Sequence, residues 1–281
     1  MNALEQLALG SQCLARGWRE AGRRELWLAW LPVLAARIGV LALLVWCAHP
    51  LVSWLLAPML RAAEGDGVLR YPELFRRLPP LAGRADLFVA AVLAPLSAGV
   101  ATLTLAPVFR GQACSPGAAW REALPRWPAL VIANLPATAA MIGLQFALTA
   151  LPGARVSGMT RMLAPYAAWV VEMLAQTAFF YASALVVLEH RSAWSAVAAI
   201  PGTLGRGFLP ALFVTATLWL FLAPLQWLGG QRELIVARGL PELVALVVLL
   251  RAGLATGLGL IASGAATLAY LGALAGREDG T

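Results

Sequence analysis

Long runs of apolar residues without a single charge dominate the chain. Four such runs cover residues 87–109, 127–154, 207–231 and 252–276. As helices rising about 1.5 Å per residue, they are long enough to cross a hydrocarbon layer about 30 Å thick. Two further apolar segments each carry one charge near their centre. The pattern predicts an all-α polytopic membrane helix bundle with six transmembrane helices, at about 26–48, 86–109, 127–151, 163–188, 208–229 and 252–275.

Two shorter apolar stretches, 51–60 and 240–250, fall below the length of a membrane span. We expect each to be a half-helix or an interfacial segment, and the alternative is eight helices if both stretches span. Residues 61–85 contain a Gly-Asp-Gly turn and three prolines, which predicts the one sizeable extramembrane loop. Residues 1–281 are treated as a single integral membrane domain.

Short amphipathic segments precede three of the predicted spans. The tetrapeptide Trp-Arg-Glu-Ala occurs at 18–21 and again at 120–123, and a looser version begins at Ser192. These segments, which we call the arms, are residues 1–25, 115–130 and 192–212. Their recurrence suggests three repeated units, with chance similarity as the alternative.

In each arm, apolar residues recur at helical spacing and arginines occupy the remaining positions. This is typical of helices that lie in the lipid headgroup region, with Trp at the boundary. For the first arm, a solvated N-terminal helix remains an alternative. We expect large apolar residues such as Trp18, Trp120 and Trp194 to lie on the apolar sides of these helices and Arg126 to face away. The proposed interfacial residues are Trp18, Arg19, Trp120, Arg121, Arg126, Trp194 and Arg206.

Composition agrees with a membrane location. Hydrophobic residues make up 60% of the chain and charged residues 12%, about half the charge of a typical soluble domain. All 21 basic residues are Arg, which together with abundant Ala, Leu and Gly suggests a GC-rich bacterial genome. The arginines are spread over every loop instead of forming a long basic run, so nucleic acid is not an expected partner. The expected partners are the lipid bilayer and other membrane proteins.

Charge gives a preferred orientation. With six helices, the two sides carry equal numbers of arginines, but four of them precede the first span, at 16, 19, 23 and 24. Because the first helix usually dominates the positive-inside rule, we expect both termini in the cytoplasm. The expected location is the bacterial inner membrane, with insertion driven by the first span because the N-terminus lacks the pattern of a signal peptide.

The arms and the helices around them resemble a known group of proteins. The matching residues are 110–112 with 119–124 after the second helix, and 180–189 with 196–212 after the fourth. They resemble uncharacterised six-helix bacterial inner-membrane proteins and the membrane domain attached to some glycerophosphodiester phosphodiesterases. The resemblance implies an architecture and carries no catalytic residues.

Charged side chains inside the predicted spans are the main candidates for chemistry. Arg37 and Glu172 lie near the middle of their helices, where an unpaired charge costs about 2.5–3.5 kcal/mol. We therefore expect an ion pair across the bundle or a water-filled cavity. One reading is a site that couples protons or substrate, extended by Gln176, Asn134 and Gln145. The other is a buried pair that fixes helix register.

Signatures of an enzyme are missing. The two histidines, His49 and His190, stand at helix ends, and no metalloprotease, nucleophile-elbow or phosphate-loop motif occurs. Three cysteines without a Cys-x-x-Cys pair indicate neither disulfides nor a metal site. We expect no catalytic residues, cofactor or metal. The leading hypothesis is a non-enzymatic membrane protein that organises lipid or protein partners; the alternative is a small-solute or proton-coupled transporter using Arg37 and Glu172.

Overall fold

The computed structural model describes residues 2–112, 115–150 and 158–278. Within these ranges the ordered elements are helices and no strand occurs, which confirms the predicted all-α class. The α-helices are α1 (Ala3–Glu20), α2 (Arg24–Val45), α3 (Pro50–Glu64), α4 (Glu73–Phe109), α5 (Pro116–Ala123), α6 (Trp127–Ala150), α7 (Gly158–Ala178), α8 (Ala182–Leu188), α9 (Ala193–Gly230), α10 (Arg232–Ala237) and α11 (Glu242–Glu278). Short 3₁₀ turns are η1 (Trp46–Ala48), η2 (Asp66–Leu69) and η3 (Leu124–Arg126).

Six helical segments among the described residues are long and apolar enough to cross a membrane. The chain is therefore a multi-pass membrane protein, and its described part contains the predicted number of candidate spans. The segments are Arg24–Val45, Glu73–Phe109, Pro116–Leu144, Trp169–Leu188, Gly207–Gly230 and Glu242–Gly272.

The loop predicted at 61–85 is largely helical. Helix α3 continues to Glu64, η2 follows, and α4 already begins at Glu73 despite Pro79 and Pro80. Each proline removes one backbone donor, at a cost of about 3 kcal/mol in a helix interior. Burial of Leu74, Leu78 and Leu81 on one helical face, at about 1.5–3 kcal/mol each, offsets this cost. From the sequence alone the prolines predict a loop, because the burial that offsets their cost is not visible there.

Neither short apolar stretch spans on its own, so the eight-helix alternative is wrong. Residues 51–60 lie within α3, which is too short to cross a bilayer. Residues 242–250 form the beginning of α11, which continues through Arg251 because arginine is a good helix former.

The contacts divide the chain into two compact units. Unit 1 contains residues 1–30, 90–219 and 258–281, and unit 2 contains residues 31–89 and 220–257.

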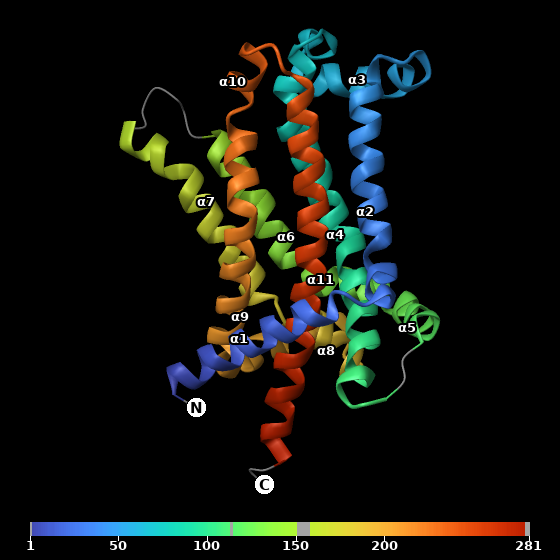
Figure 1. Ribbon diagram of the computed structural model, residues 1–281, viewed down its shortest axis with the longest axis vertical. Helices are drawn as coiled ribbons and strands as arrows, with labels where there is room; N and C mark the ends of the chain where they lie inside the picture. Colours follow the sequence, from blue (N-terminus) through green and yellow to red (C-terminus); the bar gives the residue numbers. More distant parts are fainter. Residues whose placement is uncertain (1, 113–114, 151–157, 279–281) are drawn as a thin grey trace. The chain divides into compact units, whose positions relative to one another are not determined.

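In unit 1, α1 crosses α9 and α11 at close range through glycines (Figure 1). A Cβ atom on Gly17 would lie 2.8 Å from the backbone oxygen of Ile261, and one on Gly264 would lie 3.2 Å from the Cα of Gly17. Gly10 makes a similar approach to Pro210 of α9. Small-residue contacts of this kind are typical of membrane helices, because they bring backbones close enough for extensive van der Waals contact.

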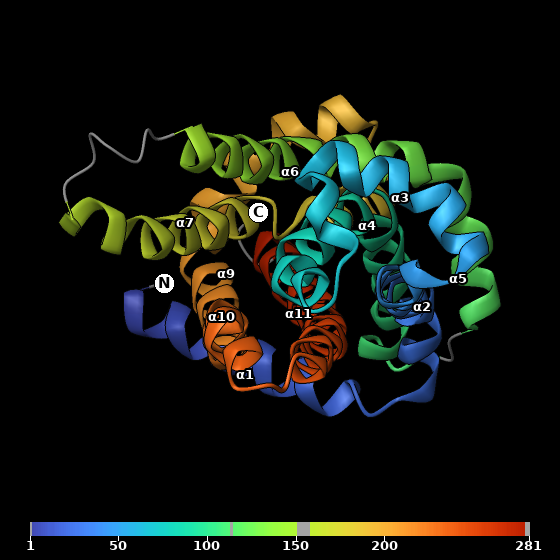
Figure 2. The same ribbon diagram turned by 90° about the horizontal axis from the view of Figure 1, so that it is seen from above.

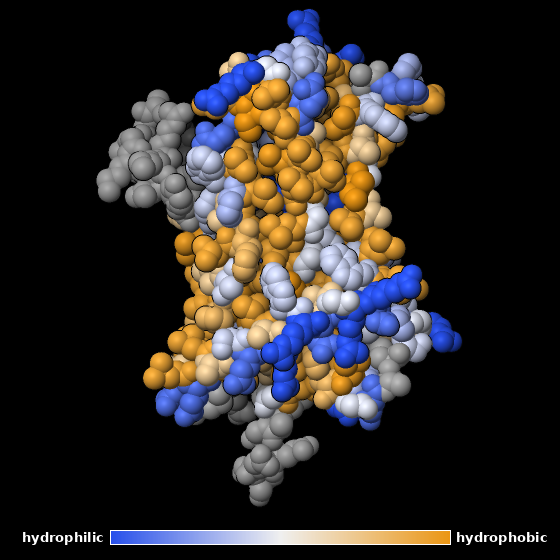
Figure 3. Space-filling model, viewed as in Figure 1, coloured by the Kyte–Doolittle hydropathy of each residue, from blue (hydrophilic) through white to orange (hydrophobic). Residues whose placement is uncertain are grey.

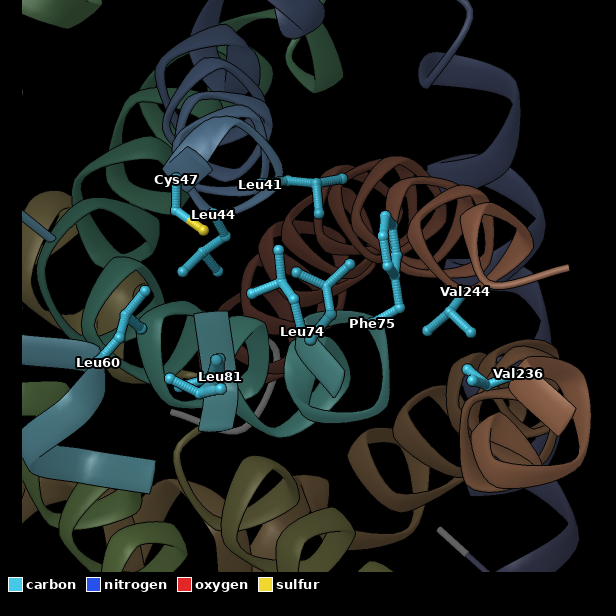
Figure 4. Packing of buried hydrophobic residues seen from close by; sticks show 11 residues of the cluster. Leu41, Leu44, Cys47, Leu60, Leu74, Phe75, Leu81, Val236 and Val244 are labelled. Carbon is cyan, nitrogen blue, oxygen red and sulfur yellow. The ribbon is translucent and has the colours of Figure 1, made fainter. Parts of the chain in front are cut away.

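Unit 2 has a hydrophobic cluster of its own, shown in Figure 4. Buried residues of α2, α4, α10 and α11 meet there, among them Leu41, Leu78, Val236 and Val244. Helix α3 covers part of this cluster and lies across the direction of α2 and α4 (Figures 1 and 2). It places Leu60 in the cluster, with Val52 and Leu56 packed against it.

Polar and apolar side chains lie over different helices on the surface. Figure 3 shows polar side chains gathered along α1, whereas the visible surface over the middle of α11 is mostly apolar. This distribution is the one expected of a spanning helix beside an interfacial one.

Candidate functional site

A charged cluster inside unit 2 joins three membrane-spanning segments. Arg37 of α2 donates from Nε to Oδ1 of Asp86 on α4 at 2.6 Å. It also donates from Nη1 to Oγ1 of Thr256 on α11 at 2.8 Å. The Thr256 hydroxyl in turn donates to the carbonyl oxygen of Ala252 at 2.8 Å. One continuous chain of hydrogen bonds therefore links the three helices.

The cost of an unpaired charge in a membrane explains why Arg37 and Asp86 are paired. The Arg37 side chain is only 10% exposed, whereas that of Asp86 is 35% exposed. A single unpaired charge in a spanning helix costs about 2.5–3.5 kcal/mol, and pairing removes most of that penalty while adding charge-assisted hydrogen bonds. The pair thus fixes the relative register of α2 and α4, and Thr256 extends the same constraint to α11.

A small cavity adjoins the pair. It has a volume of about 40 Å³ and is lined by Arg37, Asp86 and a second arginine, Arg251 of α11. The rest of the lining is apolar or small, and it includes Val40, Leu41, Gly83, Val89 and Val248. By the measure in which one water needs about 10–15 Å³, the cavity has room for roughly three water-sized groups.

The partner of Arg37 among the described residues is Asp86, whereas the sequence pointed to Glu172. In the sequence, Asp86 stands at the first residue of the predicted second span, 86–109. Because α4 begins thirteen residues earlier, at Glu73, Asp86 instead lies well inside a continuous helix. Glu172, on α7 in unit 1, is partly buried and has an interaction of its own.

The remaining predicted polar residues make local contacts. Gln176, one turn after Glu172 on α7, accepts a hydrogen bond from Nε1 of Trp219 at 3.0 Å. Asn134 donates to the carbonyl oxygen of Leu130 in its own helix at 2.9 Å. Such contacts satisfy polar groups in an apolar surrounding and hold helices together. The side chain of Gln145 lies outside the described residues.

The arms are helical, and small residues occupy most of their buried positions. In α1 the buried positions are Gly10, Cys13 and Gly17, and in α5 they are Ala119 and Ala123. The first turns of α9 bury Ala193, Ala196 and the larger Ile200. A small residue at a buried position lets two helices approach more closely than a Trp does.

The proposed interfacial residues of the arms differ in their exposure. Trp18 and Trp194 are exposed, at 53% and 74%, and Trp120 is partly buried. Arg19 is exposed, and Arg121 donates to the carbonyl oxygen of Gly117 within its helix. The side chain of Arg206 lies outside the described residues.

Arg126 does not simply face away. Its Nη1 donates to the carbonyl oxygen of Val187 at 2.9 Å, and also to the carboxylate of Glu122 at 3.3 Å. Val187 stands in the last turn of α8, where carbonyl groups lack intrahelical partners. Arg126 therefore caps α8 from the second arm, and the neighbouring Trp127 donates to the Val92 carbonyl oxygen of α4.

Helix α3 carries an exposed apolar face. Leu51, Trp54, Leu55 and Met59 are 62–82% exposed and lie on one side of the helix. We call these four residues the outward face of α3. Because α3 begins five residues after the first span ends at Val45, this face lies close to a membrane boundary.

Sequence reasoning missed Asp86, Thr256 and Arg251. Asp86 and Arg251 were treated as the ends of apolar runs, and a lone threonine in a span carries no signal. The described residues contain no group of three or more His, Cys, Asp or Glu side chains that could hold a metal ion.

Comparison with known proteins adds no relative: no family model, no curated protein and no solved structure matches this chain.

Proposed function

We propose that this chain is a non-enzymatic protein of the bacterial inner membrane that organises lipid or protein partners at the membrane boundary. In this proposal both termini lie in the cytoplasm, and the amphipathic helices provide the working surfaces. The observation that carries the proposal is the outward face of α3, whose four large apolar side chains are exposed beside the end of a span.

Two properties of α3 support this role. Its opposite side is anchored, since Leu60 is buried in the cluster of unit 2 and Glu64 at its end pairs with Arg77 and Arg84. The outward face is therefore presented by a fixed helix. A row of Leu, Trp and Met at a boundary suits contact with acyl chains or with an apolar helix of another membrane protein.

Photo-crosslinking in cells tests the proposal. A photoreactive residue replaces Trp54, and the matched control replaces Leu220, which is 72% exposed on a spanning segment. Position 54 is expected to yield a discrete adduct, either one protein or one enriched lipid class. Position 220 is expected to capture lipids in the proportions of the whole membrane. Equal, bulk-like adducts at both positions would contradict an organising role for α3.

A second function, small-solute or proton-coupled transport, is favoured by the cavity beside Arg37 and Asp86. A carboxylate paired with an arginine inside a span is a common element of proton pathways. In proteoliposomes containing a pH-sensitive dye, transport predicts a proton flux that Asp86→Asn abolishes. Absence of flux in the wild type, together with a discrete adduct at position 54, selects the organising function.

A further inference from the structure

The Arg37 guanidinium has hydrogen-bonding capacity left over. A guanidinium carries five N–H donors, and the contacts with Asp86 and Thr256 use one donor each. Arg37 lines the cavity of about 40 Å³ beside Asp86, and a second arginine, Arg251, which has an interaction of its own, lines the same cavity. The Asp86 carboxylate also lines the cavity, so the two arginines leave one positive charge in excess. Their donors suit the paired oxygens of a carboxylate or phosphate.

The size and the other walls of the cavity limit which ligands can fit it. Roughly three water-sized groups fit, which matches a carboxylate or the two outer oxygens of a phosphate. The remaining wall is mostly apolar, with Val40, Val89 and Val248 among its residues. It offers a surface for a hydrocarbon chain but few polar contacts for a sugar or an amino acid.

Access to the cavity comes from a membrane-spanning part of the chain. Arg37, Asp86 and Arg251 all belong to spanning segments, and the Asp86 side chain is 35% exposed, so the cavity is not sealed. An amphiphile in the bilayer can reach such a position. We propose that this cavity binds the single anionic group of an amphiphile, with Arg37 and Arg251 holding its oxygens and the valines supporting its chain.

Two sources share this chemistry: an anionic phospholipid of the bilayer and a free long-chain acid. Both place a negatively charged oxygen group at the end of an apolar chain. The inference does not rest on the outward face of α3, so it and the proposed function can fail separately.

Gly83 provides a variant that closes the cavity without disturbing the ion pair. It lines the cavity, and a Cβ atom built on it has no neighbour within 4 Å. Gly83→Leu therefore fills open space, and a side chain at this helical position does not destabilise α4. The matched control is Gly39→Leu on α2, where a Cβ also meets nothing within 4 Å and which does not line the cavity.

The experiment measures binding to the purified full chain by native mass spectrometry. Myristate is compared with tetradecanol in detergent, and phosphatidylglycerol with phosphatidylcholine in nanodiscs. At least one anionic member is expected to bind with a Kd about tenfold lower than its neutral counterpart, corresponding to about 1.4 kcal/mol. Gly83→Leu is expected to abolish this difference, and Gly39→Leu to preserve it.

The pair that shows the difference identifies the source, phospholipid or free acid, and a difference in both pairs assigns the shared anionic group. Inorganic phosphate alone is expected not to compete, because it lacks the chain. Equal affinity for anionic and neutral members in both pairs overturns the proposal. A preference that survives Gly83→Leu, or that inorganic phosphate removes, overturns it as well.

Discussion

Arg37 and Asp86, which form an ion pair, differ in their solvent exposure. Arg37 is almost fully buried in a spanning helix, whereas Asp86 retains partial exposure. Asp86→Ala leaves the guanidinium without its counter-ion and is expected to cost about 2.5–3.5 kcal/mol of stability. Replacing both residues, by Arg37→Met with Asp86→Leu, removes the charges together and is expected to be nearly neutral.

Thermal unfolding in detergent separates these outcomes. The single variant should have a clearly lower Tm than the wild type, and the double variant should recover most of the loss. A single variant as stable as the wild type would show that the pair does not matter for the fold. It would also show that Asp86 does not fix the register of α4.

The rate at which the Cys13 thiol is labelled is expected to depend on pH. The thiol is buried in α1, and this burial raises its pKa from 9.0 to about 11, against a smaller lowering effect from Arg16. Only the thiolate reacts with maleimides, so at pH 7 labelling should be about a hundredfold slower than for a thiol with a pKa of 9. The rate is expected to rise about tenfold per pH unit up to about pH 11. Rapid labelling at pH 7 would show that α1 leaves its place on α9 and α11.

Among the helices, contacts of glycine decide how closely α1 packs. Gly17→Ala would place a Cβ 2.8 Å from the backbone of α11, where no flexible side chain can yield. We expect a loss of about 1–3 kcal/mol. The control is Gly253→Ala in α11, whose Cβ meets nothing within 4 Å and which should be neutral or stabilising by up to about 1 kcal/mol. Equal midpoints in thermal unfolding for the two variants would refute the close contact.

The same contacts explain which part of the arm prediction succeeded. Helical spacing correctly indicated amphipathic helices ahead of α2 and α6 and at the start of α9. It did not indicate which small residues are buried, because hydropathy gives most weight to large apolar residues. In a membrane, however, a large apolar side chain is equally stable against lipid, and close approach between helices needs small residues instead.

For the whole molecule, the six spans were predictable because hydropathy and length measure the transfer of a segment into hydrocarbon. The start of α4 and the partner of Arg37 were not predictable in this way. Both depend on tertiary contacts, the burial of Leu78 in one case and the approach of α2 to α4 in the other. A helix that begins earlier than its apolar run changed Asp86 from a boundary residue into the centre of the candidate site.

Orientation is the property of the whole chain that most needs a measurement. With six spans and a cytoplasmic N-terminus, the connection after α4 faces the cytoplasm and the one between α10 and α11 faces the opposite side. Gln112 and Arg238 are exposed in these two connections. In a chain whose native cysteines are replaced, Arg238→Cys should react with an impermeant maleimide in intact spheroplasts, and Gln112→Cys only after permeabilisation. The reverse pattern would invert the orientation, and labelling of both from one side would contradict the number of spans, because an even number of crossings would then separate the two positions.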